Sequence, residues 1–176
     1  MVEMVQESVR LREFEPSDLQ FLRELRSDTK LQNLMLAYPK LDGVGDTEAW
    51  LDRRMQEFGG LFKIIAEADD LPIGFVQIAN VHRRGRYGYV GICLTPNVRG
   101  RGYGAVAMKL LMGLASESLG LRKLILESRA DNFAALQLYE KLGFSTVGSF
   151  LQHYYDGKDW FDVVLMERQI EGLKQK

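Results

Sequence analysis

The sequence pattern predicts β-strands in seven segments of the chain, and in the first three of them hydrophobic and polar residues alternate with a period of two, as in strands with one buried face. These segments are 9–14, 62–68, 73–79, 87–94, 123–127, 144–151 and 160–167. The turn signals Asp69–Asp70 and 82–86 separate three of them, so we expect 62–94 to form a three-stranded antiparallel meander. Asp156–Gly157 is a turn signal that predicts a hairpin from the last two segments.

Four other segments carry hydrophobic residues at helical spacing. They cover 16 to about 29, 47–58, 103–119 and 132–142. Pro16 favours a helix start, and a glycine directly after each of the last three segments favours a helix end. The segment 103–119 is apolar on most sides, so we expect a buried helix there. We expect 31–45 to be a loop over one mouth of the fold.

The predicted order of elements is β-α-α-β-β-β-α-β-α-β-β. A helix between the strands 87–94 and 123–127 favours parallel pairing of those two strands, whereas the meander and the hairpin are antiparallel. The sequence therefore predicts an α/β fold with a mixed central sheet of about seven strands and four flanking helices. A chain of 176 residues has room for one well-buried core, so we expect a single domain, 1–176.

Composition narrows the classes of partner and compartment. The 23 basic and 24 acidic residues leave a net charge of -1, which predicts no general attraction to nucleic acid or anionic membranes. One cysteine and two histidines argue against a disulfide framework and a cysteine/histidine zinc site, and suit a reducing cytoplasm. No apolar stretch approaches about 18 residues, and the first ten residues contain Glu3 and Glu7, so we expect neither a membrane span nor secretion.

Residues 96–107 read PNVRGRGYGAVA, a glycine- and arginine-rich loop that leads into the predicted helix 103–119. Free N–H groups at a helix start bind anions such as a pyrophosphate, and glycines let the backbone approach the oxygens closely. One alternative is a tight connection with solvated arginines. Another is a dinucleotide site, since 102–107 fits GxGxxA and Glu127 ends the next strand, although the preceding strand ends near Leu94, too early for that fold.

The predicted helix 132–142 carries two polar residues on one side. Asn132 and Tyr139 are seven residues apart, about two helical turns, so both face the same direction. This spacing is typical of a ligand groove. It is also compatible with an N-cap asparagine and a tyrosine that packs in the core.

Two stretches of the chain resemble the GNAT family of N-acetyltransferases. The acyl-CoA motif of that family, Gln/Arg-x-x-Gly-x-Gly/Ala, is matched by RGRGYG at 99–104, and its stretch N-x-x-A-x-x-x-Y-x-x-x-G-F is matched at 132–144. The resemblance extends to RLREFEPSDL near the N-terminus and covers nearly the whole chain. It implies the GNAT fold, with splayed fourth and fifth strands, and acetyl-CoA as the co-substrate. The coenzyme-binding residues that it implies are Leu94, Arg99, Gly100, Arg101, Gly102, Tyr103, Gly104, Ala105, Asn132 and Tyr139.

The resemblance also implies roles in catalysis. The backbone N–H of Leu94 matches the group that polarises the thioester carbonyl, and Tyr139 matches the residue that protonates the departing thiolate. Many members place a glutamate on the fourth strand, where this chain has Gly88, so the general base is open. Glu127 is our candidate, with a solvated acid at a strand end as the alternative.

The resemblance implies a primary amine as the acceptor, which could be a polyamine, a peptide N-terminus or an amino sugar. Acidic residues near the expected mouth would attract a polycation, or are simply solvated: Asp42, Asp46 and Glu48. The hairpin 153–160 borders the acceptor site and subunit contacts in relatives, which makes a homodimer plausible. A non-catalytic acyl-CoA-binding module is the alternative function.

Two further features have plain structural interpretations. Cys93 lies on an apolar strand with no histidine nearby in the sequence, which favours a buried small hydrophobic residue over a nucleophile. The basic segment 82–86 lacks interleaved aromatic residues, which favours a solvated hairpin turn over an RNA-binding patch.

Overall fold

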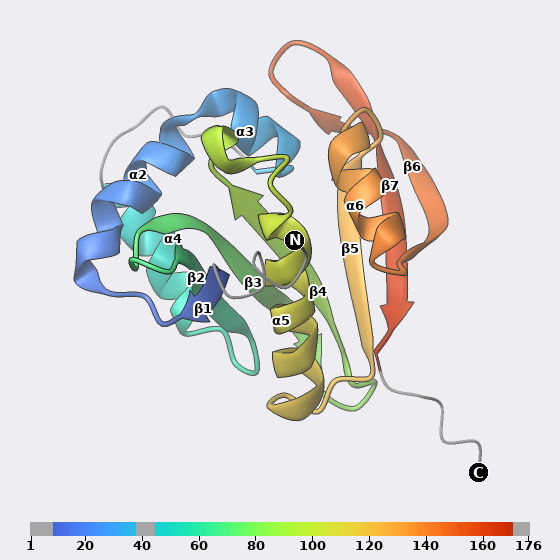
Figure 1. Cartoon of the computed structure of the whole chain (residues 1–176). Coiled ribbons are helices and arrows are strands. Elements are labelled where there is room, and N and C mark those ends of the chain that lie inside the picture. The colour runs from blue at the N-terminus through green and yellow to red at the C-terminus, as the bar shows by residue number, and fades with distance from the viewer. Residues whose placement is uncertain (1–8, 38–44, 171–176) are drawn as a thin grey trace.

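The structure is a computed structural model that describes residues 9–37 and 45–170. Its centre is a seven-stranded sheet with the order β1-β2-β3-β4-β5-β7-β6, which confirms the predicted mixed sheet (Figure 1). The strands are β1 Val9–Arg12, β2 Leu61–Glu67, β3 Pro72–His82, β4 Tyr87–Leu94, β5 Lys123–Arg129, β6 Ser145–Tyr155 and β7 Trp160–Gln169. The pairs β2–β3 and β3–β4 are antiparallel, so the predicted meander is confirmed, and β4–β5 is parallel.

The described residues form one more α-helix than the sequence predicted. The α-helices are α2 Leu19–Ser27, α3 Thr29–Leu34, α4 Gly45–Met55, α5 Tyr103–Glu117 and α6 Phe133–Lys141, with 3-10 turns η1 Pro16–Asp18 and η2 Pro96–Val98. The predicted helix from 16 to about 29 ends earlier because Asp28 adopts an extended conformation (ψ 96°). Its side chain accepts a hydrogen bond from the Leu31 amide (3.0 Å) and starts α3. The expectation that 31–45 is a loop is therefore wrong for 31–34 and for Gly45, where α4 begins, and residues 38–44 lie outside the described residues.

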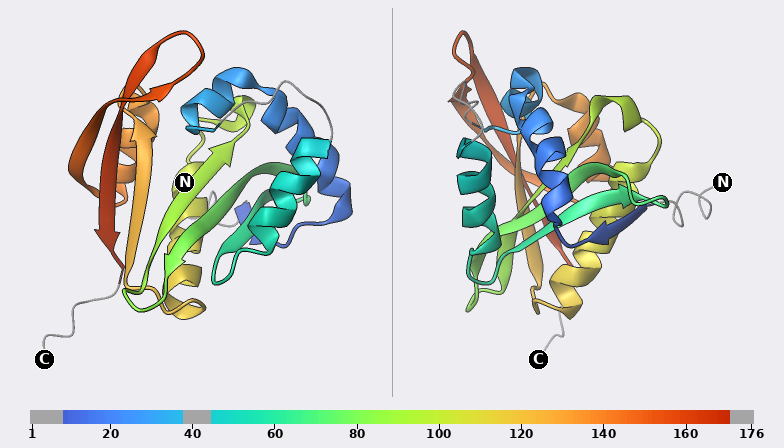
Figure 2. Two further views of the ribbon diagram at one scale, coloured as in Figure 1. Left: turned by 180° about the vertical axis from the view of Figure 1, so that it is seen from behind. Right: turned by 90° about the vertical axis from the view of Figure 1, so that its left-hand side faces the viewer.

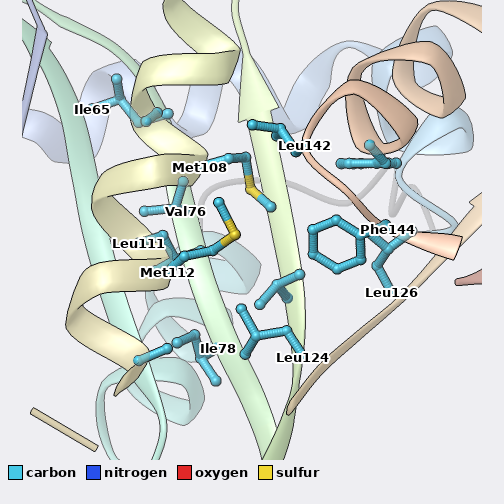
Figure 3. Close-up of a cluster of buried hydrophobic side chains, with 14 of the residues drawn as sticks. Ile65, Val76, Ile78, Met108, Leu111, Met112, Leu124, Leu126, Leu142 and Phe144 are labelled. Carbon is cyan, nitrogen blue, oxygen red and sulfur yellow. The ribbon is translucent and has the colours of Figure 1, made fainter. Parts of the chain in front are cut away.

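Helices cover both faces of the sheet. Helices α5 and α6 lie on one face and α2, α3 and α4 on the other (Figure 2). On the first face, Met108, Leu111 and Met112 of α5 pack against Leu124 and Leu126 of β5 in a large hydrophobic cluster (Figure 3). This packing agrees with the apolar character that predicted a buried helix here. Across the described residues, no helix is long and apolar enough to cross a membrane.

A second, smaller hydrophobic cluster lies on the α2–α4 face. It contains Leu22, Leu25, Leu31, Leu51, Phe62, Ile64, Phe75 and Cys93. Because neighbouring side chains along a strand point to opposite faces, the odd-numbered residues of β4 lie on this face with Cys93. The even-numbered residues of β4 lie on the α5–α6 face with Val90, which belongs to the larger cluster.

The strands β4 and β5 pair over only part of their length. Their parallel register covers Tyr87–Tyr89 against Lys123–Ile125. Beyond these pairs β4 stays with β3 as far as Leu94 and β5 stays with β7 as far as Arg129, so the two strands diverge (Figure 1). The sheet is therefore open between β4 and β5, as the GNAT resemblance implies.

Candidate active site

A cavity of about 590 Å³ lies at the opening between β4 and β5. On the α5–α6 face its walls are the loop before α5 and one side of α6. On the other face they include α3, the adjoining Met35 and Leu36, and the side chains of Gln77 and Glu127. Residues 89–94 of β4 lie between these walls. The cavity therefore reaches both faces of the sheet, and two substrates can meet in the opening.

The edge of β4 presents main-chain groups to the opening. The Thr95 amide donates to the Ile73 carbonyl (2.9 Å), so in the antiparallel ladder Leu94 and Gly74 form a pair without mutual hydrogen bonds. The N–H and C=O of Leu94 therefore point away from β3. The carbonyl oxygen accepts hydrogen bonds from Nε and Nη2 of Arg99 (3.3 and 3.2 Å). The Leu94 N–H is left directed toward the opening, as the oxyanion role requires.

The loop before α5 forms a cradle of amides. Gly100 and Gly102 have φ of 77° and 85°, a left-handed backbone that glycine adopts at little cost. Arg99 N–H donates to the Pro96 carbonyl (3.4 Å) and Ala105 N–H donates to the Gly102 carbonyl (3.1 Å). Between these two residues, the part of the chain that the structure describes offers no backbone acceptor to the amides of 100–104. These amides stand at the positive end of α5 and fit the diphosphate of a coenzyme.

Gly104 brings α5 and α6 together. It is buried, and a Cβ at this position would lie 3.2 Å from Cδ2 of Leu138 on α6. This close approach places the start of α5 beside α6, so the amide cradle and the polar residues of α6 face one cavity. Of the residues that the sequence singled out, those that line the cavity are Leu94, Arg99, Gly100, Gly102, Gly104, Ala105, Glu127, Asn132 and Tyr139. Arg101 and Tyr103 are not among its lining residues.

Helix α6 contributes Asn132 and Tyr139 to the same cavity. Asn132 is the N-cap residue, but its side chain makes no capping hydrogen bond and is available to a ligand. Tyr139 is 8% exposed, and no hydrogen bond of its hydroxyl exists within the described residues. Burial, with a smaller contribution from Cys93, raises the pKa of Tyr139 to about 12. Tyr139 is therefore a protonated phenol at neutral pH and has a proton to donate.

The two candidate positions for the base lie on opposite faces. A Cβ on Gly88 would lie 2.8 Å from Cγ2 of Ile78, inside the hydrophobic core, so this position has no room for a carboxylate. Glu127 is exposed, lies on β5 opposite Leu165 of β7, and lines the cavity. The carboxylate that this structure supplies to the opening is therefore Glu127.

The other predicted features occupy ordinary structural roles. Cys93 is 1% exposed, and burial raises its pKa to about 12, as expected for a small hydrophobic residue rather than a nucleophile. The segment 82–86 is a hairpin turn in which Nδ1 of His82 accepts a hydrogen bond from the Gly85 amide (2.8 Å). Glu48 pairs with Arg23. Asp42 and the side chain of Asp46 lie outside the described residues.

The 153–160 hairpin contacts the segment that begins with α3. The hydroxyl of Tyr154 lies within hydrogen-bond distance of Oδ1 of Asn33 (2.9 Å) and of the carbonyl oxygen of Ala37 (2.7 Å), and shares its one proton between them. Asn33 belongs to α3, whose Leu31 and Leu34 line the cavity. The hairpin thus fixes the end of the helix that forms this wall of the cavity. The sequence missed this wall because 31–45 was interpreted as a loop.

Comparison with known proteins decides the family. The family model described as "Acetyltransferase (GNAT) domain" matches residues 8–145. The chain belongs to the GNAT acetyltransferase family. It is 25% identical to the spermidine N(1)-acetyltransferase of Escherichia coli (strain K12), over 90% of this chain and 84% of that protein. It is 30% identical to N-alpha-acetyltransferase 30 of Schizosaccharomyces pombe, over 59% of this chain and 71% of that protein.

Solved structures of GNAT enzymes share the fold. The crystal structure of a Vibrio cholerae spermidine N-acetyltransferase in complex with CoA and spermine superposes with a TM-score of 0.85, at 20% identity, over 92% of this chain and 95% of that chain. The GNAT fold is therefore confirmed. The protein is an N-acetyltransferase that moves an acetyl group from acetyl-CoA to an amine. The dinucleotide-site and non-catalytic alternatives are set aside.

Proposed function

We propose that this enzyme binds acetyl-CoA on the α5–α6 face and receives a primary amine from the α3 face. The observation that carries this proposal is the cavity itself, which joins the amide cradle to the α3 wall through the opening between β4 and β5. The amides of 100–104 would hold the diphosphate, with charge from Arg99 and Arg101 at the rim. Asn132, with no capping bond, would contact the pantetheine arm.

The reacting groups meet at the centre of the cavity. The amine nitrogen attacks the thioester carbon, and the Leu94 N–H stabilises the negative charge that develops on the carbonyl oxygen. As the C–S bond breaks, Tyr139 gives its proton to the sulfur. Glu127 takes the proton that the amine loses, directly or through one water. Proximity of the two bound substrates supplies much of the rate acceleration.

A polyamine is our first candidate for the acceptor. The similarity to the Escherichia coli spermidine N(1)-acetyltransferase spans 90% of this chain, whereas the similarity to the Schizosaccharomyces pombe N-alpha-acetyltransferase spans 59%. A peptide N-terminus is the second candidate, supported by the higher identity, 30%, over the shorter match.

An acceptor screen tests the proposal. Purified protein with acetyl-CoA is expected to release free thiol when spermidine is added, and to release less with an amino sugar or a short peptide bearing a free N-terminus. The release is followed with a thiol reagent, and the acetylated product is identified by mass spectrometry. If the peptide gave the faster release, the second candidate would replace the first. An absence of thiol release with every amine would refute the proposed transfer.

We also propose self-association through the β6–β7 hairpin and a cytoplasmic location. Strand β6 is an edge strand, and the hairpin exposes large hydrophobic side chains, with Leu151 78% and Trp160 59% exposed. Hydrophobic residues of this size on an edge strand are typical of a surface covered by another chain. We expect sedimentation velocity to find a dimer or larger assembly that Leu151→Lys dissociates. A wild-type monomer at micromolar concentration would contradict this expectation.

A further inference from the structure

Gln77 is a polar residue in the middle of a buried strand. It lies on β3, where it pairs with Phe62 of β2 on one side and Gly91 of β4 on the other. Paired residues of antiparallel strands point to the same face, and Phe62 belongs to the hydrophobic cluster on the α2–α4 face. Gln77 therefore lies on the acceptor side of the sheet, and its side chain lines the cavity.

Gly91 and Glu127 extend this row across the opening. The last pair of the parallel register joins Tyr89 to Ile125, so the next residues on the same face are Gly91 on β4 and Glu127 on β5. Because Gly91 has no side chain, no side chain covers β4 at this position, between Gln77 on β3 and Glu127 on β5. Gln77 and Glu127 thus stand on the two sides of Gly91, at the level where the sheet opens.

The carboxamide of Gln77 lacks the partner that a buried polar group normally has. Its Oε1 is fully buried and pairs with nothing among residues 9–37 and 45–170. Its Nε2 would lie 3.2 Å from a Cβ on Gly91, so the amide extends over the bare strand. A buried polar atom without a partner is costly, so no hydrogen bond of Oε1 holds the carboxamide in this orientation.

We propose that Gln77 binds the acceptor amine at its nitrogen and helps to select it. Because Oε1 has no hydrogen bond to lose in its present position, a half-turn of the carboxamide can direct it toward the space above Gly91. There Oε1 accepts one amine N–H while Glu127, on the other side, accepts another. The lone pair of the nitrogen is then left facing the opening, where the acetyl carbon must lie. This inference rests on the proposed function.

The test compares Gln77→Met with wild type. Methionine keeps the length of the side chain and removes its hydrogen-bonding groups. We expect the KM for the amine to rise about 5- to 10-fold, the value of one net hydrogen bond, with the Kd of acetyl-CoA unchanged by calorimetry. Gln20→Met is the matched control, because Gln20 is exposed on α2, bonds Glu24 and lies outside the cavity. It should leave both constants unchanged.

A second variant moves the amide without removing it. Gly91→Ala puts a methyl group 3.2 Å from Nε2 of Gln77, so the carboxamide must shift. The methyl group also occupies part of the space proposed for the amine. We expect a higher amine KM here too. An unchanged KM in Gln77→Met overturns the inference, as does a rise accompanied by weaker acetyl-CoA binding, which would indicate a structural role. Failure of the proposed function is distinct, since wild type would then release no thiol with any amine.

Discussion

Tyr139→Phe is expected to lower kcat by about 10²- to 10⁴-fold, the usual contribution of a general acid, while the Kd of acetyl-CoA changes little. Phenylalanine keeps the ring in its contact with Phe144, at a centroid distance of 6.0 Å, and removes only the hydroxyl. The departing thiolate then lacks its proton donor. Steady-state kinetics with the preferred amine, together with calorimetry of acetyl-CoA, separates the two constants.

The pH dependence gives an independent check on the same residue. Burial holds the pKa of Tyr139 at about 12, so the acid stays protonated throughout the neutral range and is lost only as the pH rises toward that value. The wild-type profile should therefore show no alkaline decline from Tyr139 near pH 8 to 9. Tyr155→Phe is a matched control, since its hydroxyl bonds the Gly157 carbonyl in the hairpin turn (3.0 Å). Equal kcat values for Tyr139→Phe and wild type would remove Tyr139 from the mechanism.

Gly102→Ala is expected to weaken acetyl-CoA binding by about tenfold or more. Gly102 has a φ of 85°, and a left-handed backbone costs an L-residue roughly 1–2 kcal/mol. An alanine at this position would relieve the strain by changing its backbone angles, and this change would turn neighbouring N–H groups of 100–104 away from the diphosphate. Since the cradle is formed by backbone groups alone, no side chain can replace them. Calorimetric titration with acetyl-CoA or CoA measures the change in Kd.

The control for this variant lies at the other end of the same helix. Gly120 follows α5, has a φ of 63°, and a Cβ there would meet nothing within 4 Å. Gly120→Ala therefore imposes a comparable backbone strain far from the cavity. We expect a similar loss of thermal stability in both variants, with weaker acetyl-CoA binding only in Gly102→Ala. If both variants kept wild-type affinity, the diphosphate would not be held by this loop.

Local features of this protein were predictable from the sequence. The strand 87–94 was placed at its observed bounds, because the turn signal at 82–86 and the apolar character of the segment are local properties. The glycines at 100 and 102 were expected to let the backbone approach an anion, and they permit the left-handed backbone observed there. The common direction of Asn132 and Tyr139 follows from helical spacing, and both do line the cavity. When the residues of a motif are consecutive in the chain, the sequence alone predicts how they are arranged.

Local signals also produced the one error in the fold. The run from 16 to about 29 has a continuous helical pattern, and nothing in its periodicity marks the break at Asp28. The break depends on the extended backbone of Asp28 and on the hydrogen bond from its side chain to the Leu31 amide. The wall that α3 forms is then held from a distant segment, through the Tyr154 hydroxyl on β6.

By itself the sequence determined the strands, the helices other than α3, their order and the glycine loop before α5, since each arises from residues within a few turns of one another. Only the tertiary structure decided which side chains lie together on one face of the sheet. Gly88 lies against the core, while Gln77, Gly91 and Glu127 form one row at the opening, because the register between strands sets which side chains meet. Strand register joins residues far apart in the chain, and a shift of one position would exchange the two faces.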